Sequence, residues 1–372
     1  MKEYIKPLDD IITNKFLPTL LDSAISELDR ELFSLPIRYG GLGIPNLSEL
    51  SEIQFQNSKA ITLPLVTVMI LQDEIIPNLS EMQDIKHQRT QDQTNKISEN
   101  SKSIMEKLPK TTARAMKEAK LPGASSWLSA LPLSEYGFSL NKSEFRDALN
   151  IRYNKPLKGL PSICPCGQKY DVTHALNCKR GGFITIRHNN IRDFEAGLLS
   201  KVAADVEIEP ELQPVEGEKF KGLIGDNSKP DIRARGFWRN AQNAFFDVRI
   251  TNTLSPSQCH LSTEKILKKH EMEKKRNYNQ RIMNIEHGTF TPLVFSVSGC
   301  MGTECSMYHK QLAEKLALKT DECYTKIISA IRCKLSFIIL KSVLMCVRGS
   351  RSFKLKNIDE FEAVAVDARI IE

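Results

Sequence analysis

Four residues that commonly bind metal ions lie within one short segment of the chain: Cys164, Cys166, His174 and Cys178. Gly167 follows the first two cysteines and permits a tight turn there. His174 and Cys178 are four residues apart, so they would share one face of a helix. Thiolates and an imidazole in a set of four are typical of closed, tetrahedral zinc sites. The spacing predicts a structural Zn²⁺ that supports folding and nucleic-acid contact; the alternative is a set of buried thiols and a core histidine.

The other cysteines show no such spacing. Cys259, Cys300 and Cys305 are interpreted as core or surface thiols. The nine cysteines are an odd number, and the polar first residues do not read as a secretory signal. These features argue against a disulfide framework and favour a reducing, intracellular location.

Two aspartates are candidates for a second metal site. Asp231 begins a short β-like run, and Asp247 interrupts the apolar run between Phe245 and Ile250. A carboxylate within a buried strand is costly unless it is paired or binds a metal. On adjacent strands the two carboxylates could hold Mg²⁺ together with water and a phosphate oxygen. Glu195, on a preceding helix, could supply a third carboxylate; alternatively, each residue is an ordinary turn or surface acid.

A hydrolytic site of this kind also needs a cation near the developing charge. Arg249 follows Asp247 by two residues, but an arginine cannot accept a proton at neutral pH. Lys274 or Lys275 could reach the site from a long basic helix instead. The alternative is a solvated basic face that binds DNA phosphates, and we expect Lys268, Lys269 and Arg249 to contribute to DNA binding.

A polar cluster follows the cysteine segment. Arg187, His188 and Asn189 could contact phosphate or orient a water molecule, and Lys229 is a further candidate for DNA contact. A capping or structural role for Asn189 is the alternative.

The residues after Cys178 predict the elements that would position these side chains. We expect a helix over 183–204, three β-like runs, a basic helix over 261–286, a buried strand over 293–297 and two closing helices. The β-like runs cover 206–215, 230–234 and 244–251, and the closing helices cover 304–319 and 321–347. The order α-β-β-β-α-β-α predicts an α/β sandwich.

The first part of the chain is expected to be helical. Residues 80–107 are polar and read as an exposed helix or a loose linker. We divide the chain into five parts: a helical region 1–79, the polar segment 80–120, a connector with the cysteine cluster 121–181, the α/β domain 182–347 and a tail 348–372. A net charge of +7 is compatible with nucleic acid, and no apolar run is long enough to predict a membrane span.

The motifs CPCG, HALNC, RHNNIRD, KPD and FFDVRI, in this order, resemble the restriction-like endonuclease of non-LTR retrotransposons. That family carries a Cys-Cys-His-Cys knuckle, an Arg-His-Asn/Asp motif, a Lys/Arg-Pro-Asp motif and a second acidic residue. In that family a catalytic lysine follows, displaced onto a helix shortly before a tyrosine. Here the tyrosine would be Tyr278, which implies Lys274 as the first choice for the catalytic lysine and Lys275 as the second.

The resemblance implies a PD-(D/E)xK nuclease that nicks target DNA in the nucleus, so that the 3′ end primes reverse transcription. It implies structural Zn²⁺, catalytic Mg²⁺, DNA as the partner and element RNA as a further partner. Residues 35–44, LPIRYGGLGI, resemble the region that follows the palm and thumb of retroelement polymerases, which implies that the helical region 1–79 is a thumb-like remnant. The polymerase palm has no counterpart in this sequence, so we do not expect it to copy RNA. The alternative function is a catalytically dead remnant that binds nucleic acid through the knuckle and the basic helix.

Overall fold

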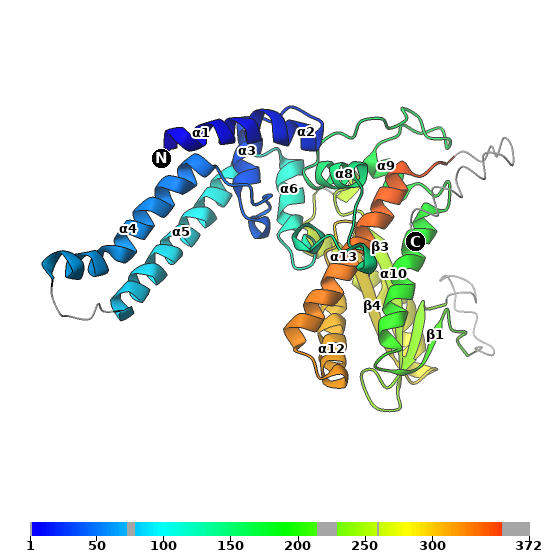
Figure 1. Ribbon diagram of the computed structural model, residues 1–372. Helices are drawn as coiled ribbons and strands as arrows, with labels where there is room; N and C mark the ends of the chain where they lie inside the picture. Colours follow the sequence, from blue (N-terminus) through cyan, green and yellow to red (C-terminus); the bar gives the residue numbers. More distant parts are fainter. Residues whose placement is uncertain (1, 73–78, 214–228, 259, 352–372) are drawn as a thin grey trace.

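The computed structural model describes residues 2–72, 79–213, 229–258 and 260–351. The described chain is mixed α/β and mostly helical, with one four-stranded sheet (Figure 1). The α/β class predicted from the sequence is therefore confirmed. Cys259, the end of the predicted run 206–215 and nearly all of the tail 348–372 lie outside the described residues.

The sheet has the strand order β1-β2-β3-β4. Its strands are β1 Ala204–Ile208, β2 Ile232–Arg235, β3 Asn243–Thr251 and β4 Thr289–Ser296. The first two pairings are antiparallel, and β3 pairs with β4 in parallel. A parallel pair needs a long crossover, and here helix α11, Thr263–Asn284, supplies it. These elements follow the order predicted from the sequence, although β4 begins four residues earlier than expected.

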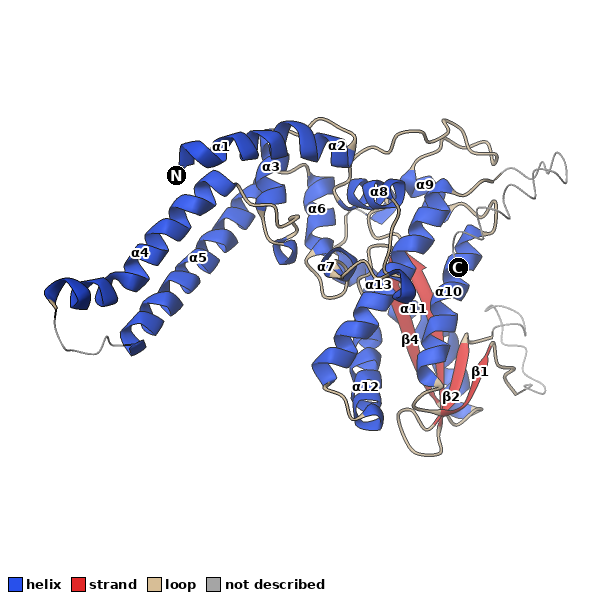
Figure 2. Cartoon of the chain, in the orientation of Figure 1, coloured by secondary structure: helices blue, strands red, loops and turns tan. Residues whose placement is uncertain are grey.

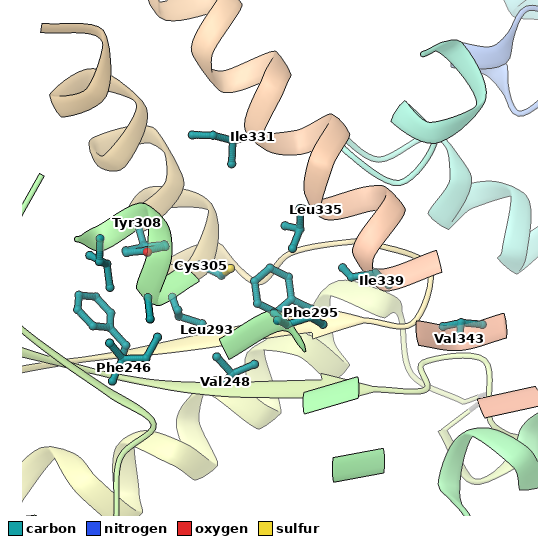
Figure 3. Close-up of a cluster of buried hydrophobic side chains, with 14 of the residues drawn as sticks. Phe246, Val248, Leu293, Phe295, Cys305, Tyr308, Ile331, Leu335, Ile339 and Val343 are labelled. Atoms are coloured by element: carbon teal, nitrogen blue, oxygen red, sulfur yellow. The ribbon is translucent and has the colours of Figure 1, made fainter. Parts of the chain in front are cut away.

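Helices cover both faces of the sheet. α10 (Phe183–Leu199), α12 (Thr303–Thr320) and α13 (Tyr324–Arg348) pack on one face, and α11 packs on the other. On the first face, Phe246 and Phe295 meet side chains of α12 and α13 such as Tyr308 and Leu335 (Figure 3). Each apolar side chain of this size stabilises the fold by about 1.5–3 kcal/mol when it is fully buried.

Alternation along β3 decides which side chains can do chemistry. Phe246 and Val248 lie in the core with α12 and α13, so Asp247 and Arg249 point to the opposite face, toward α11. The strand thus presents polar groups only on the side that the basic helix covers.

The N-terminal part consists of helices joined by turns and loops, with no strand among its described residues. Its elements are α1 Lys2–Ile11, a π-helical turn Ile12–Phe16, α2 Leu17–Leu21, α3 Glu27–Ser34, α4 Leu47–Leu71, α5 Leu79–Lys107 and α6 Lys110–Ala119. Helices α4 and α5 lie side by side and project away from the rest of the chain (Figure 2). The polar segment 80–107 is therefore an exposed helix, and a loose linker is wrong for these residues.

Short helices connect the N-terminal part to the sheet domain. They are α7 Ser126–Ser129, α8 Lys142–Arg152 and α9 Val172–Asn177, with 3₁₀ turns at Ile37–Tyr39, Ser134–Tyr136 and Pro256–Gln258. α8 begins at Lys142 because Asn141 and Glu144 form a capping box. The Asn141 side chain accepts from the Glu144 N–H at 2.9 Å, and the Glu144 carboxylate accepts from the Asn141 N–H at 2.9 Å.

Helix α13 joins two hydrophobic cores. Leu335 and Ile339 pack toward the sheet, whereas Phe337 and Leu344 pack against the N-terminal helices. A helix that is apolar on most sides is expected where protein covers it on more than one side. Among the described helices, none is both long enough and apolar enough to cross a membrane.

Candidate functional site

The four residues of the cysteine cluster converge on one point. The ligand atoms of Cys164, Cys166, His174 and Cys178 all lie within 4.8 Å of one another. The sulfurs of Cys164 and Cys178 are 3.8 Å apart, and Cys166 Sγ is 3.4 Å from His174 Nε2. A tetrahedron with Zn–S bonds of about 2.3 Å has sulfur–sulfur edges of about 3.8 Å. The cluster could therefore hold a metal ion such as zinc.

Local structure explains the convergence. Gly167 has a φ of +88°, in the left-handed region that glycine tolerates, and its N–H donates to the Cys164 carbonyl at 2.8 Å. His174 lies on α9, whose first turn is capped by the Asp171 carboxylate at 2.7 Å from the His174 N–H. The backbone N–H of Gln168 is the main cause of a lowered pKa at the Cys166 thiol, which favours the thiolate form that binds metal.

The cluster is fastened to the end of α13. The buried Arg351 guanidinium donates to the Tyr170 hydroxyl at 2.6 Å and to the Ala175 carbonyl at 3.0 Å. It also donates to the Cys346 carbonyl and lies over the Phe183 ring at 4.9 Å from the centroid. The segment that carries the metal ligands therefore has a fixed position on the α/β domain.

The two candidate aspartates are neighbours across β2 and β3. The antiparallel register pairs Ile232 with Phe246, and Asp231 comes directly before β2, where its carboxylate accepts from the Val248 N–H beside Asp247. Both side chains are largely buried. The arrangement gathers two carboxylates, the donor type that hard divalent cations prefer.

Lys274 is the cation at this pair. Its ammonium lies 2.6 Å from Asp247 Oδ2 and 5.8 Å from the centroid of the Tyr278 ring. Lys274 is on α11, and Ile266, His270, Tyr278 and Ile282 follow the same four-residue repeat along the helix. Because α11 packs this stripe against the sheet, the lysine is carried to the aspartates.

Burial raises the pKa of Asp247 to about 6. Lys274 opposes this shift, and the negative charge of Asp231 adds to it. Burial and the two aspartates also raise the pKa of Tyr278. A buried carboxyl with a strongly shifted pKa beside a second carboxylate is typical of a functional site.

His188 contacts Asp231 rather than the protein surface. Its Nε2 lies 2.9 Å from Asp231 Oδ1, and the other carboxylate oxygen accepts from the Val248 N–H at 2.6 Å. The sequence reasoning placed His188 in a phosphate-contact role, and it missed this hydrogen bond to the acidic site.

Glu195 does not join the pair, which corrects the expectation of a third carboxylate. It is fully buried, with its carboxylate oxygens at 3.0 Å from His309 Nε2 and 3.2 Å from the Tyr308 hydroxyl. Glu195 lies on the face of α10 that packs against α12, and its partners occupy both oxygens in the core.

Two further residues are placed differently from the sequence-based expectations. Lys275 lies 2.6 Å from Glu304 on α12, so it points away from Asp247. Arg187 is only 3% exposed and lies beside Cys346, and burial lowers its pKa. Arg187 therefore offers little surface to DNA, contrary to its expected role.

The remaining candidates for DNA contact lie at or near the surface. Lys229 and Lys268 form ion pairs with Glu211 and Glu271, while Lys269 is exposed on α11 and Asn189 is half-buried on α10. Arg249 lies 3.1 Å from Glu273, a carboxylate that the sequence reasoning missed. The sequence offered one signal for a role of Glu273 on the side of α11 that faces the sheet. Glu273 follows His270 by three residues, and residues at this spacing are neighbours on the helix surface.

Comparison of the sequence with known proteins identified no relative of this chain. No protein-family model matches the chain, and no curated protein matches it.

Proposed function

We propose that the chain is a metal-dependent DNA endonuclease, of the restriction-like type that its motifs resemble. The observation that carries the proposal is the convergence of Asp231, Asp247 and Lys274, which come from two strands and a helix. Two carboxylates at the sheet and one lysine from the helix that covers it are functional groups suited to phosphodiester hydrolysis with a divalent cation.

Each residue has a distinct role in this proposal. Asp231 and Asp247 would hold Mg²⁺ through one oxygen each, because both are carboxylates and lie on the same face of the sheet. When bound, the ion would polarise the scissile phosphate and make the attacking water more acidic. Lys274 would neutralise the charge that develops on the phosphate, since its ammonium already lies beside Asp247.

The origin and cellular role are part of the proposal. The protein would derive from a non-LTR retrotransposon and nick target DNA in the nucleus for target-primed reverse transcription, with element RNA as a further partner. The cysteine cluster would be its zinc knuckle, loaded with structural Zn²⁺ and placed to contact nucleic acid. The support for this role is the order of motifs together with the four-ligand cluster.

The second candidate function is a nucleic-acid-binding remnant that does not cut. The exposed basic side chains of α11, among them Lys265, Lys269 and Arg276, favour nucleic-acid binding without requiring catalysis. Such binding would weaken steeply as salt rises, because phosphate contacts release counterions.

A plasmid-nicking assay separates the two functions. The full chain is incubated with supercoiled plasmid and Mg²⁺ beside Asp247→Ala and a control, Asp84→Ala, which changes an exposed aspartate on α5. We expect nicking by the wild type and by Asp84→Ala, and only the metal-free background from Asp247→Ala. Equal nicking by all three, or salt-sensitive binding without any nicking, would reject the endonuclease function.

A further inference from the structure

Both oxygens of Asp231 are engaged by donors from different elements. The Val248 amide of β3 holds Oδ2 at 2.6 Å, and His188 Nε2 of α10 holds Oδ1 at 2.9 Å. The hydrogen bond from the amide alone would leave the carboxylate plane free to rotate about the Cβ–Cγ bond of Asp231. The imidazole, 43 residues away in the sequence, removes that freedom.

The imidazole itself is held by a fixed helix. Ile191 and Leu199, on the same helix as His188, have no exposed surface and pack in the core beneath the sheet. The His188 side chain is 29% exposed, and its ring nitrogen Nε2 is directed at Asp231. A phosphate contact would require this nitrogen to leave the carboxylate.

The hydrogen bond leaves room for a metal ion. An ionised carboxylate offers about four lone-pair sites, so each Asp231 oxygen can accept one hydrogen bond and still bind a cation. Asp247 lies next to Val248, whose amide contacts Asp231, and Lys274 is the ionic partner of Asp247. Only Asp231 therefore depends on α10 for its orientation.

We propose that His188 is a positioning residue, whose hydrogen bond fixes the Asp231 carboxylate so that Asp231 and Asp247 can share one divalent cation. The inference rests on the proposed metal site, and it makes α10 a part of that site. Groups that orient a metal-binding side chain typically contribute 10–100-fold to metal affinity. His188 would thus act on metal binding rather than on DNA binding.

The test measures metal affinity directly. Mn²⁺ is titrated calorimetrically into the zinc-loaded full chain, and duplex DNA affinity is measured separately without divalent cations. We expect His188→Ala to raise the Kd for Mn²⁺ about 10–100-fold and to leave DNA affinity unchanged. His188→Gln should recover most of the metal affinity, because its amide N–H can donate from a similar place. His87→Ala, at an exposed histidine on α5, is the matched control.

The outcomes separate this inference from the proposed function. Unchanged Mn²⁺ affinity in His188→Ala, or a loss confined to DNA affinity, would overturn the positioning role even if the wild type nicks plasmid. Weaker Mn²⁺ binding in His188→Ala with rescue by His188→Gln supports the role, even if no variant nicks. Absence of Mn²⁺ binding by the wild type would overturn it as well. Melting curves show whether each variant is folded, and if His188→Ala unfolds, His188→Leu, which fills the space but cannot donate a hydrogen bond, takes its place in the comparison.

Discussion

The cysteine cluster and the aspartate pair are two candidate metal sites built in opposite ways. The cluster draws all its ligands from one segment, with Cys164 and Cys178 separated by 14 residues. The pair draws on two strands and is completed by His188 from α10 and Lys274 from α11. The cluster can organise its own short segment, whereas the pair is assembled only when the whole sheet domain has folded. The cysteine cluster should therefore stabilise the fold, whereas the aspartate pair should lower the free energy of unfolding.

The largest effect is expected at the cluster. Cys164→Ala removes one of four ligands, and structural zinc sites of this type contribute about 10–16 kcal/mol of binding free energy in small peptides. We expect zinc to be lost and the amides of residues 164–178 to exchange rapidly with solvent, as measured by hydrogen–deuterium exchange. Cys323→Ala, at an exposed thiol before α13, is the control and should retain both zinc and protection. Equal protection in the two variants would show that the segment needs no metal.

A smaller effect, confined to activity, is expected at the lysines. Lys274→Met should reduce nicking about 10²–10³-fold, the range typical when one electrostatic stabiliser of the transition state is removed. Lys275→Met removes a neighbouring charge that pairs with Glu304 and should retain most of the activity. Single-turnover nicking rates measure both. A larger loss in Lys275→Met than in Lys274→Met would reverse the assignment of the cation.

The smallest effect is a gain of stability when the aspartate pair is disrupted. In the folded protein the pKa of Asp247 is raised from 3.8 to about 6, so the ionised form is disfavoured by folding. The resulting cost is absent below the unfolded pKa, grows between about pH 4 and 6, and is complete above the folded pKa. Without divalent cations, Asp247→Asn should therefore be more stable than the wild type by about 3 kcal/mol at pH 8 and about equal to it below pH 4.

Urea denaturation between pH 4 and 8 measures this difference. Added Mg²⁺ should reduce the advantage of Asp247→Asn, because a ligand that binds only the folded wild type stabilises it. A wild type that is more stable than Asp247→Asn at pH 8 without metal would contradict the contrast between the two sites.

Features that depend on local sequence could be predicted. The cluster follows from spacing alone, and α8 follows from its capping residues, so both lie where the sequence indicates. The order of strands and helices in the sheet domain could also be predicted, because the spacing of apolar residues changes between alternating and helical patterns at segments that contain Gly and Pro.

Features that depend on the rotation of a helix could not be predicted from composition. Glu195 and His188 are both on α10, yet one contacts α12 and the other contacts Asp231. Lys274 and Lys275 are adjacent; the family resemblance ranked Lys274 first, and among features of the sequence itself the stripe that begins at Ile266 separates them. Arg187 was expected at the surface because arginine usually is, but packing against α13 buries it.

The Arg351 contacts fix the distance between the cysteine cluster and the aspartate pair. Because this side chain locks the cysteine-bearing segment onto α13, the segment and the sheet cannot move independently of each other. If the proposed endonuclease function holds, a duplex bound at the cysteine cluster would reach Asp231 and Asp247 after a constant number of base pairs. The register of a cut would then be set by the rigid span of the protein, without any reading of the bases at the cut itself.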